Sequence, residues 1–218
     1  NPNSFELGRI DTDLMYDIVM KWEWGNSGSD AIYHDPQTRS QGLSFRSNLA
    51  RLTEALLSEN KIDKARDIID VAMENIPLEH YGFYAFVEPF VDGYYKVGEK
   101  QKGRALFEQL KGIYQNRLTY YADIPLDEQY EKIEDILSDM QAYRRNIDIL
   151  IENEDRSLAE EETKVFNQYI DKFSQFVGDD DEDYFDEPFE EDPDLQDSTL
   201  EDSLTQVLDT LAEIDTIE

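Results

Sequence analysis

The sequence predicts an all-α fold made of stacked helical hairpins, capping helices, an acidic tail and a C-terminal amphipathic helix. Three observations predict it. Apolar residues recur at helical spacing over most of the first 177 positions, a pattern of small and large residues occurs twice in the centre, and the charge is uneven. The formal net charge of the 218 residues is −31, and positions 178–218 hold 18 acidic residues and no Lys or Arg. The predicted organisation is a helical domain over 1–177, an acidic linker over 178–197 and a helix over 198–218.

The N-terminal region predicts one helix from Asp11 to Trp24. Asp11 or Thr12 can accept hydrogen bonds from the free backbone amides of the first turn. A Gly- and Ser-rich run at 25–29 ends the helix, and residues 30–42 are expected to form a loop with a short helical turn. The apolar stripe expected to face the core comprises Leu14, Met15, Ile18, Val19 and Trp22.

The centre of the chain carries a residue pattern that predicts a helical hairpin. Its small residues, Ala65 and Ala72, would let two antiparallel helices approach closely. A tight turn is expected at 60–64, and Pro77 is expected to end the second helix. The order and spacing of the large and small residues in this pattern are those of a tetratricopeptide repeat. The matching positions are Leu49, Leu52, Leu56, Ala65, Ile69, Ala72 and Pro77.

A second, irregular copy of the pattern follows. Its turn residue Gly98 lies 38 positions after Asn60, compared with about 34 in a standard repeat. Pro89 is expected to end, kink or delay the first helix of this copy. The matching positions are Val87, Phe90, Tyr94, Gly103, Phe107 and Leu110.

Beyond Pro125 the repeat period is lost, although helical spacing continues. One helix is predicted from Asp127, as its cap, to about Glu152, and another from a capping box at Ser157 and Glu160 to Phe176. The end of a repeat array needs atypical helices that cover its apolar face, so we expect these two to be capping helices. Their stripes are Ile133, Ile136, Leu137, Met140, Tyr143, Ile147 and Leu150, then Val165, Phe166, Tyr169, Ile170 and Phe173.

The tail combines an acidic segment with an amphipathic one. Charge density predicts an extended or disordered linker at 178–197, whose aromatics Tyr184, Phe185 and Phe189 are either an anchor for another protein or part of a solvated spacer. The helix predicted at 198–218 must dock in order to be stable. Docking in this domain's own groove is favoured over a partner, and both over a membrane surface, because its polar face is acidic.

The sequence offers little basis for catalysis. It contains no cysteine, which excludes disulfides and thiolate chemistry, and no phosphate loop or nucleophile motif. Its two histidines, His34 and His80, lie beside expected loops and outside any metal-ligand pattern. The acids of 179–190 match a calcium-loop template, but Tyr184 stands where that loop needs Gly. We therefore expect no enzyme activity, no cofactor and no metal site in this segment.

The charge also limits the class of partner. A strongly acidic surface repels phosphate backbones, so nucleic acid is not expected, whereas a basic or mixed-charge protein or peptide is. On the usual superhelix of such repeats, the concave side would present Ser47, Ala50, Glu54, Glu88, Asp92 and Tyr95. The alternative is a groove filled by the protein's own elements. The predicted binding residues are Asn48, Arg51, Glu54, Glu88, Asp92 and Tyr95.

Two motifs together resemble a known family. The first is Gly8-Arg9-Ile10-Asp11-Thr12-Asp13 with Met15-Tyr16-Asp17 and Trp24-Gly25-Asn26, and the second is Arg46-Ser47-Asn48-Leu49-Ala50-Arg51-Leu52 with Ala55-Leu56. They are similar to the C-terminal region of large bacterial multi-pass membrane proteins of unknown function. In that family a glycosyltransferase-C-like, protein-O-mannosyltransferase-like membrane part precedes a soluble helical-repeat region. The likeness covers about residues 8–125.

The resemblance implies a function for this segment that is non-catalytic. It would be an extramembrane interaction domain on the periplasmic side of the inner membrane, positioning an acceptor protein or a partner subunit, and membrane contact would be made only by the preceding region. For the shared motif positions we favour a structural role over a functional one; these positions are Asp11, Trp24, Asn26 and Arg51. The alternative is a freestanding tetratricopeptide adaptor whose acidic tail regulates its groove.

Overall fold

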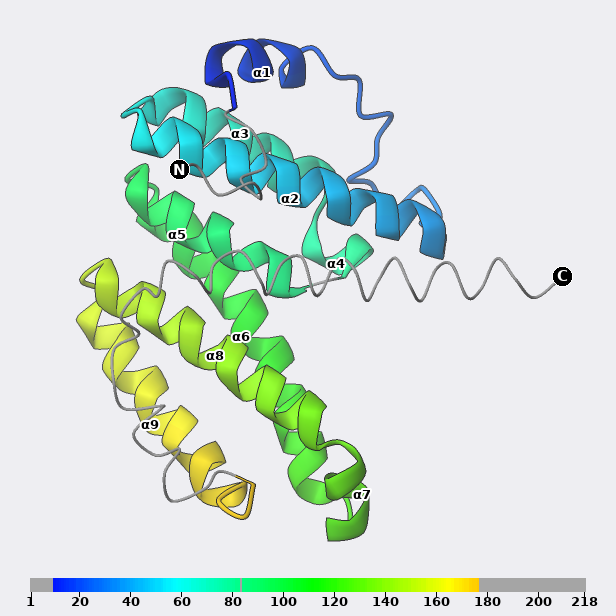
Figure 1. Ribbon diagram of the computed structural model, residues 1–218, viewed down its shortest axis with the longest axis vertical. Coiled ribbons are helices and arrows are strands. Elements are labelled where there is room, and N and C mark those ends of the chain that lie inside the picture. Colours follow the sequence, from blue (N-terminus) through cyan, green and yellow to red (C-terminus); the bar gives the residue numbers. More distant parts are fainter. Residues whose placement is uncertain (1–9, 83, 177–218) are drawn as a thin grey trace, which may run out of the picture. The chain divides into compact units, whose positions relative to one another are not determined.

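The computed structural model describes residues 10–82 and 84–176, which belong to one compact unit, Asn1–Phe176 (Figure 1). Every regular element in this part of the chain is helical, so the all-α prediction is confirmed there. None of its helices combines the length and apolar character needed to cross a membrane. The acidic linker and the helix predicted at 198–218 lie outside the described residues. The elements are α1 (Thr12–Val19), α2 (Pro36–Ser58), α3 (Ile62–Asn75), α4 (Leu78–Tyr81), the 3-10 turn η1 (Tyr84–Val87), α5 (Glu88–Lys96), α6 (Lys100–Asp123), α7 (Leu126–Glu131), α8 (Ile133–Glu152) and α9 (Arg156–Lys172).

Most of these helices form hairpins of two packed helices. Hairpin 1 is α2 with α3, hairpin 2 is α5 with α6, and hairpin 3 is α8 with α9. The hairpins follow one another along the unit, because α3 packs on α5 and α6 packs on α8 (Figure 1). The first helices α2, α5 and α8 thereby lie side by side.

The same turn connects the two helices in each hairpin. Its central residue has a left-handed backbone, with φ of 57° at Asn60, 83° at Gly98 and 57° at Glu154. Asn and Gly adopt this conformation at low cost, whereas Glu does so less readily. The next residue's amide donates a 2.8 Å hydrogen bond to the carbonyl five positions earlier, in the pairs Lys61–Leu56, Glu99–Tyr94 and Asp155–Leu150.

A small buried residue lies five positions after each turn residue. These residues are Ala65, Gly103 and Ala159, the first fully buried and the last 4% exposed. At Gly103 a Cβ would come within 2.9 Å of the Tyr95 ring, so the contact between the two helices of hairpin 2 leaves no room for a side chain there. The core surrounds these positions and includes Leu49, Leu52, Leu56, Ile69, Ala72, Phe90, Phe107, Leu110, Tyr143, Leu150 and Phe166.

Beyond Pro125 the repeat period is lost, as predicted, but the two helices expected as capping helices pair with each other as hairpin 3. Its turn residue Glu154 lies 56 positions after Gly98, whereas Gly98 lies 38 after Asn60. The additional residues lengthen α6 to 24 residues and add the short helix α7. A constant period therefore cannot reveal the third hairpin, although its turn and its small residue repeat those of the first two.

The N-terminal helix differs from its prediction in length and orientation. Asp11 caps α1 as expected, accepting a 3.0 Å hydrogen bond from the Leu14 amide. However, α1 ends at Val19 and not at Trp24, and its buried side chains are Thr12 and Val19. Leu14 is 58% exposed and Ile18 41% exposed, so the predicted apolar stripe is wrong there.

The predicted loop at 30–42 is also wrong in its second half. Helix α2 begins at Pro36, where the Asp35 side chain accepts a 3.0 Å hydrogen bond from the Thr38 amide. An aspartate cap followed by proline is a favourable helix start. Gly42 lies within α2 because the Tyr81 ring occupies the space where a larger side chain would project.

Two predicted caps in the C-terminal half are wrong. Asp127 lies inside α7, which begins after Pro125. The Ser157–Glu160 capping box does not form, because the hairpin turn places the start of α9 at Arg156 with Asp155 in the cap position. Pro89 falls in the first turn of α5, where backbone amides have no partner within the helix, so the missing amide of proline costs no helical hydrogen bond there. Of the three outcomes expected for Pro89, the structure shows the delayed start of this helix.

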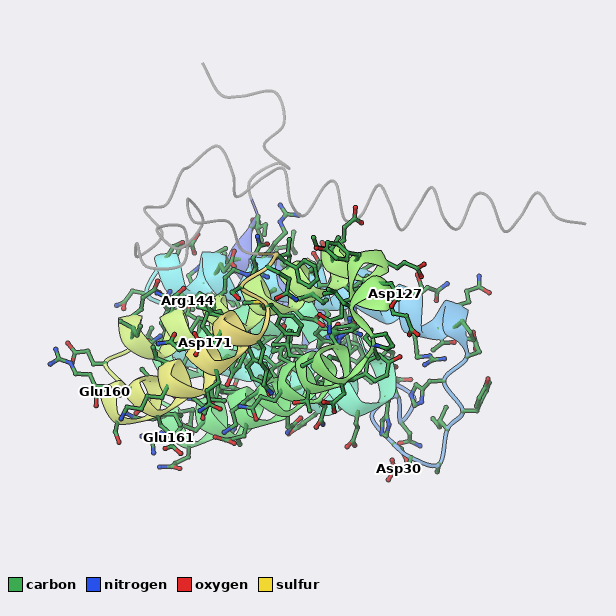
Figure 2. The ribbon with its side chains drawn as sticks, turned by 90° about the horizontal axis from the view of Figure 1, so that it is seen from below. Asp30, Asp127, Arg144, Glu160, Glu161 and Asp171 are labelled. Atoms are coloured by element: carbon green, nitrogen blue, oxygen red, sulfur yellow. The ribbon has the colours of Figure 1, made fainter. Side chains whose placement is uncertain are left out.

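Repeated ion pairs fix the hairpins relative to one another. In hairpins 1 and 2 an arginine stands six residues after the turn residue, and it faces the cap acid of the next hairpin. Arg66 Nε lies 3.5 Å from Glu99 Oε1, and Arg104 donates two hydrogen bonds, of 2.7 and 2.6 Å, to Asp155. Hairpin 3 has exposed Glu160 at the arginine position (Figure 2), so the same contact cannot continue beyond it.

Candidate functional site

The surface of the first helices carries a repeated acidic residue. Each of α2, α5 and α8 has an acid six residues before its turn residue, namely Glu54, Asp92 and Asp148. Because α2 contacts α5 and α5 contacts α8, these acids follow one another across neighbouring helices. We refer to Glu54, Asp92 and Asp148 as the acid row.

Basic side chains lie beside the acid row. Lys96 Nζ is 2.6 Å from Asp92 Oδ2, and Arg144 Nε is 2.9 Å from Asp148 Oδ1. The Asn153 side-chain amide donates a 3.0 Å hydrogen bond to the other oxygen of Asp92. The Asp92 and Asp148 side chains remain 21% and 27% exposed, so both can still accept hydrogen bonds from outside.

Glu54 begins the row on α2. Surrounding protein reduces the hydration of its carboxyl and raises the pKa of Glu54, even though the residue as a whole is exposed. Lys96 and Arg51 oppose this rise in pKa, whereas the nearby charge of Asp92 adds to it. The carboxyl of Glu54 is therefore electrostatically coupled to the charged groups of α5.

Glu88 forms a second ionic group with α8. Arg145 donates hydrogen bonds of 3.0 and 3.3 Å to its two oxygens, and the Tyr114 hydroxyl lies 3.4 Å away. Burial raises the pKa of Glu88, and the Arg145 charge opposes that rise. The Arg145 side chain is 53% exposed, so part of it remains accessible from solvent while its guanidinium binds Glu88.

The structure divides the residues predicted to bind. Lys96 pairs with Asp92, and the charges of Lys96 and Arg51 both act on the Glu54 carboxyl, whereas Glu88 is engaged by Arg145. The Asn48 side-chain amide donates to the Ser44 carbonyl within α2. The Tyr95 hydroxyl donates a 2.8 Å hydrogen bond to buried Asp155, so Tyr95 serves the contact between hairpins 2 and 3 and does not join the acid row.

Four residues of this surface are not among those predicted from the sequence to bind. Asp148, Arg144 and Arg145 were missed because hairpin 3 was not recognised as a hairpin. Lys96 was missed because its role depends on the approach of α2 to α5. The sequence does contain a signal for Asp148. It is an acid six positions before the turn residue Glu154, and the small residue Ala159 lies five positions after that turn residue.

The motif positions of the family resemblance have structural surroundings. Asp11 caps α1, and the Trp24 ring packs edge-on against Trp22 and Phe45, with ring centroids 5.4 and 6.3 Å apart. Asn26 has a left-handed backbone, φ 62°. Arg51 is partly buried on α2.

A separate hollow of about 410 Å³ lies between α6 and α9. It is open and contains a mixture of charged and small side chains, so it lacks the apolar enclosure typical of small-molecule sites. Its lining residues are Gln101, Arg104, Ala105, Glu108, Ser157, Leu158 and Glu161.

Comparison of the chain with protein-family models, with curated proteins and with solved structures finds no match.

Proposed function

We propose that this domain is a non-catalytic protein-interaction module that binds a polypeptide segment across α2, α5 and α8. The segment would carry Lys or Arg at intervals that match the acid row, together with an acid for Arg144 or Arg145. We further infer that the three hairpins are tetratricopeptide-like repeats. The common turn and the buried Ala65, Gly103 and Ala159 support this assignment.

The observation that carries the proposal is the recurrence of an acid at one position of three adjacent helices. Core positions repeat because packing requires them, but Glu54, Asp92 and Asp148 are at least partly exposed. Surface positions have no such packing constraint. A polypeptide extended across the three helices would meet one carboxylate on each of them, and charge-assisted hydrogen bonds to such groups are stronger than neutral ones.

Peptide display on the whole chain tests this proposal. We expect selected peptides to be enriched in Lys and Arg, and the triple variant Glu54→Gln, Asp92→Asn, Asp148→Asn to bind them at least about tenfold more weakly, because several charge-assisted hydrogen bonds are lost. The dissociation constants would be measured by calorimetry at about 0.15 M salt, where long-range attraction is screened.

A matched control separates the acid row from net charge. The triple variant Asp127→Asn, Glu160→Gln, Asp171→Asn removes the same number of negative charges from exposed positions on α7 and α9 (Figure 2). It should change affinity by less than about threefold. Equal weakening in both variants, or a selection without basic peptides, would refute the proposed site.

We propose two alternative protein contexts for this module. In the first, it is the extramembrane part of a glycosyltransferase-like membrane protein on the periplasmic side of the inner membrane, and it positions an acceptor protein or partner subunit. In the second, it is a freestanding adaptor whose acidic tail regulates the binding surface. The coding sequence upstream of Asn1 distinguishes them, because the first context requires several apolar segments of about 20 residues.

A further inference from the structure

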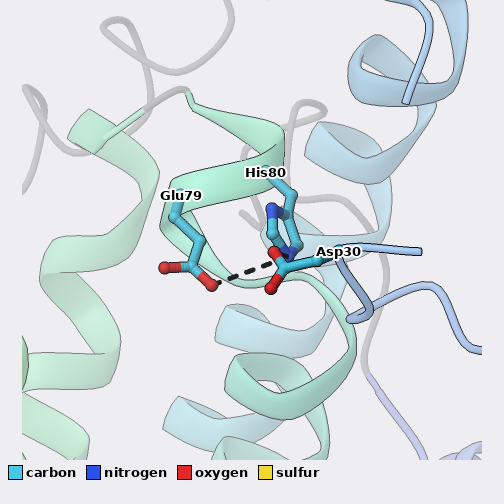
Figure 3. Close-up of side chains that lie close together, drawn as sticks. All are labelled: Asp30, Glu79 and His80. Carbon is cyan, nitrogen blue, oxygen red and sulfur yellow. Dashed lines mark ion pairs between the residues drawn. The ribbon is translucent and has the colours of Figure 1, made fainter. Parts of the chain in front are cut away.

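Three potential metal ligands from different parts of the sequence converge beside α4. Asp30 lies in the connection between α1 and α2, and Glu79 and His80 lie on α4 (Figure 3). One ligand atom from each lies within 4.8 Å of the others. His80 Nε2 is 3.2 Å from Asp30 Oδ1 and 3.5 Å from Glu79 Oε1.

The two separations from His80 Nε2 match those expected in a first coordination shell. Zinc binds imidazole nitrogen and carboxylate oxygen at about 2.0 to 2.2 Å, so two ligand atoms of a tetrahedral ion lie about 3.3 to 3.6 Å apart. The two distances from His80 Nε2 are close to this range. Two carboxylates also supply a charge that a divalent cation neutralises, and a water molecule can complete a set of three protein ligands.

The His80 ring is held in place by a second histidine. The His34 and His80 rings stack with centroids 5.1 Å apart and planes 13° apart, and the His80 side chain is only 14% exposed. His34 Nε2 donates a 2.7 Å hydrogen bond to the Ser27 carbonyl. The two histidines of the chain, 46 positions apart, therefore lie together at one place.

The backbone that carries Asp30 is also anchored. The Ser27 hydroxyl donates a 2.8 Å hydrogen bond to the Asn75 carbonyl at the end of α3. Gly28 lies directly against the backbone of Glu74, where any Cβ would overlap the Glu74 carbonyl oxygen. This anchoring holds the backbone of the connection close to α4. The Asp30 and Glu79 side chains are 92% and 73% exposed, so the part of the entropic cost of binding that is saved is that of the backbone.

We propose that Asp30, Glu79 and His80 bind a divalent transition-metal ion, with Zn²⁺ as the best-fitting ion. Imidazole favours zinc and its neighbours in the transition series over Mg²⁺ and Ca²⁺, which prefer oxygen ligands alone. The ion would join the connection between α1 and α2 to α4, and so would stabilise this end of hairpin 1. The site is independent of the acid row, which lies on α2, α5 and α8.

The test titrates the full-length chain with Zn²⁺ in excess Mg²⁺, which occupies weaker acidic sites. With ¹⁵N-labelled histidine, only two imidazoles give signals, and saturation should shift His80 Nε2 to the range of a metal-bound nitrogen. His34 Nε2, which keeps its proton for the Ser27 carbonyl, serves as the internal reference. The melting temperature should rise at the same stoichiometry, because Zn²⁺ binds the folded chain preferentially.

Variants assign the ligands. His80→Gln and Asp30→Asn should each weaken Zn²⁺ binding at least about tenfold, the lower bound for losing a supporting partner of a metal site, whereas exposed Asp171→Asn on α9 should leave it unchanged. An unshifted His80 Nε2 at saturating Zn²⁺ would overturn the proposal. Equal affinity in His80→Gln and the unchanged chain would do so as well, because the ion would then be bound by acidic groups elsewhere.

Discussion

The two contacts between successive hairpins use the same sequence positions but differ in their surroundings. Between hairpins 1 and 2, Arg66 approaches Glu99 at 3.5 Å, and the side chains are 33% and 39% exposed. Between hairpins 2 and 3, Arg104 binds Asp155 through two shorter hydrogen bonds, and the Asp155 side chain is only 2% exposed. An equivalent position in a repeat therefore does not imply an equivalent energy.

The difference arises from what surrounds each carboxylate. Asp155 also accepts a hydrogen bond from Tyr95 and lies 3.1 Å from Lys100, so its oxygens are fully engaged and removed from water. Arg66, in contrast, divides its hydrogen bonds between Asp63 and the Val97 carbonyl. Burial with complete pairing makes the loss of one partner costly, whereas exposed pairs contribute little.

The largest expected effect is that of Asp155→Ala. We expect the free energy of unfolding to fall by about 2 to 3 kcal/mol, because Tyr95 loses its acceptor and two cations lose their shared carboxylate. This value is below the full cost of breaking a buried pair because Arg104 and Lys100 are 38% and 44% exposed and can turn to water. Urea denaturation at pH 7 would measure it, and a loss under about 1 kcal/mol would remove the distinction between the two contacts.

The pH dependence of this effect should be smaller and has a defined sign. The Arg104 guanidinium hydrogen-bonded to Asp155, helped by Tyr95 and Lys100, holds the pKa of Asp155 well below its usual range. In the unfolded chain an aspartate titrates near pH 3.9. The stabilisation by ionised Asp155 is thus complete above about pH 5, where the unfolded-state aspartate is also ionised, and is lost as the pH falls toward its folded-state pKa.

The difference in free energy of unfolding between the unchanged chain and Asp155→Ala should therefore become smaller as the pH falls from 5 to about 3. Comparison of the two chains cancels the contributions of other acids, including Glu88, whose pKa is raised by burial. Denaturation midpoints at several pH values would measure this difference. A constant difference over this range would show that Asp155 acts through packing and not through its charge.

The sequence predicted the long helices of the fold better than their caps and the pairing of the last two. The pattern around Ala65 and Ala72 predicted a hairpin whose alanines are both fully buried, because close helix packing requires small residues at fixed spacing. The two helices of hairpin 3 were predicted as capping helices and not as a further copy of the pattern, because a 24-residue α6 and the added α7 disturb the period. Ala159 and the turn at Glu154 carried the signal, but Glu is an uncommon residue in a left-handed conformation.

The site was less predictable than the fold for a physical reason. Glu54, Asp92 and Glu88 could be placed on first helices from helical periodicity alone. Whether the Tyr95 side chain faces solvent or contacts the neighbouring hairpin depends on the distance between α5 and the turn at Glu154. The spacing of residues along the sequence does not determine that distance. The meeting of His80 with Asp30 likewise depends on how the connection after α1 packs against α3.

The smallest expected effect is that of Glu99→Gln, which removes the charge at the equivalent contact between hairpins 1 and 2. We expect a loss under about 0.5 kcal/mol at 0.05 M NaCl, because the pair is partly exposed and its charged atoms are 3.5 Å apart. Salt should abolish that loss at 0.5 M NaCl, since screening acts strongly on exposed charges, while the Asp155→Ala loss should persist because water and ions reach Asp155 poorly. Urea denaturation of both variants at the two salt concentrations measures this contrast. If Glu99→Gln lost as much stability as Asp155→Ala and kept that loss at high salt, the two contacts would contribute equally to the free energy of unfolding. Their shared position in the hairpin, and not the burial of the carboxylate, would then determine that contribution.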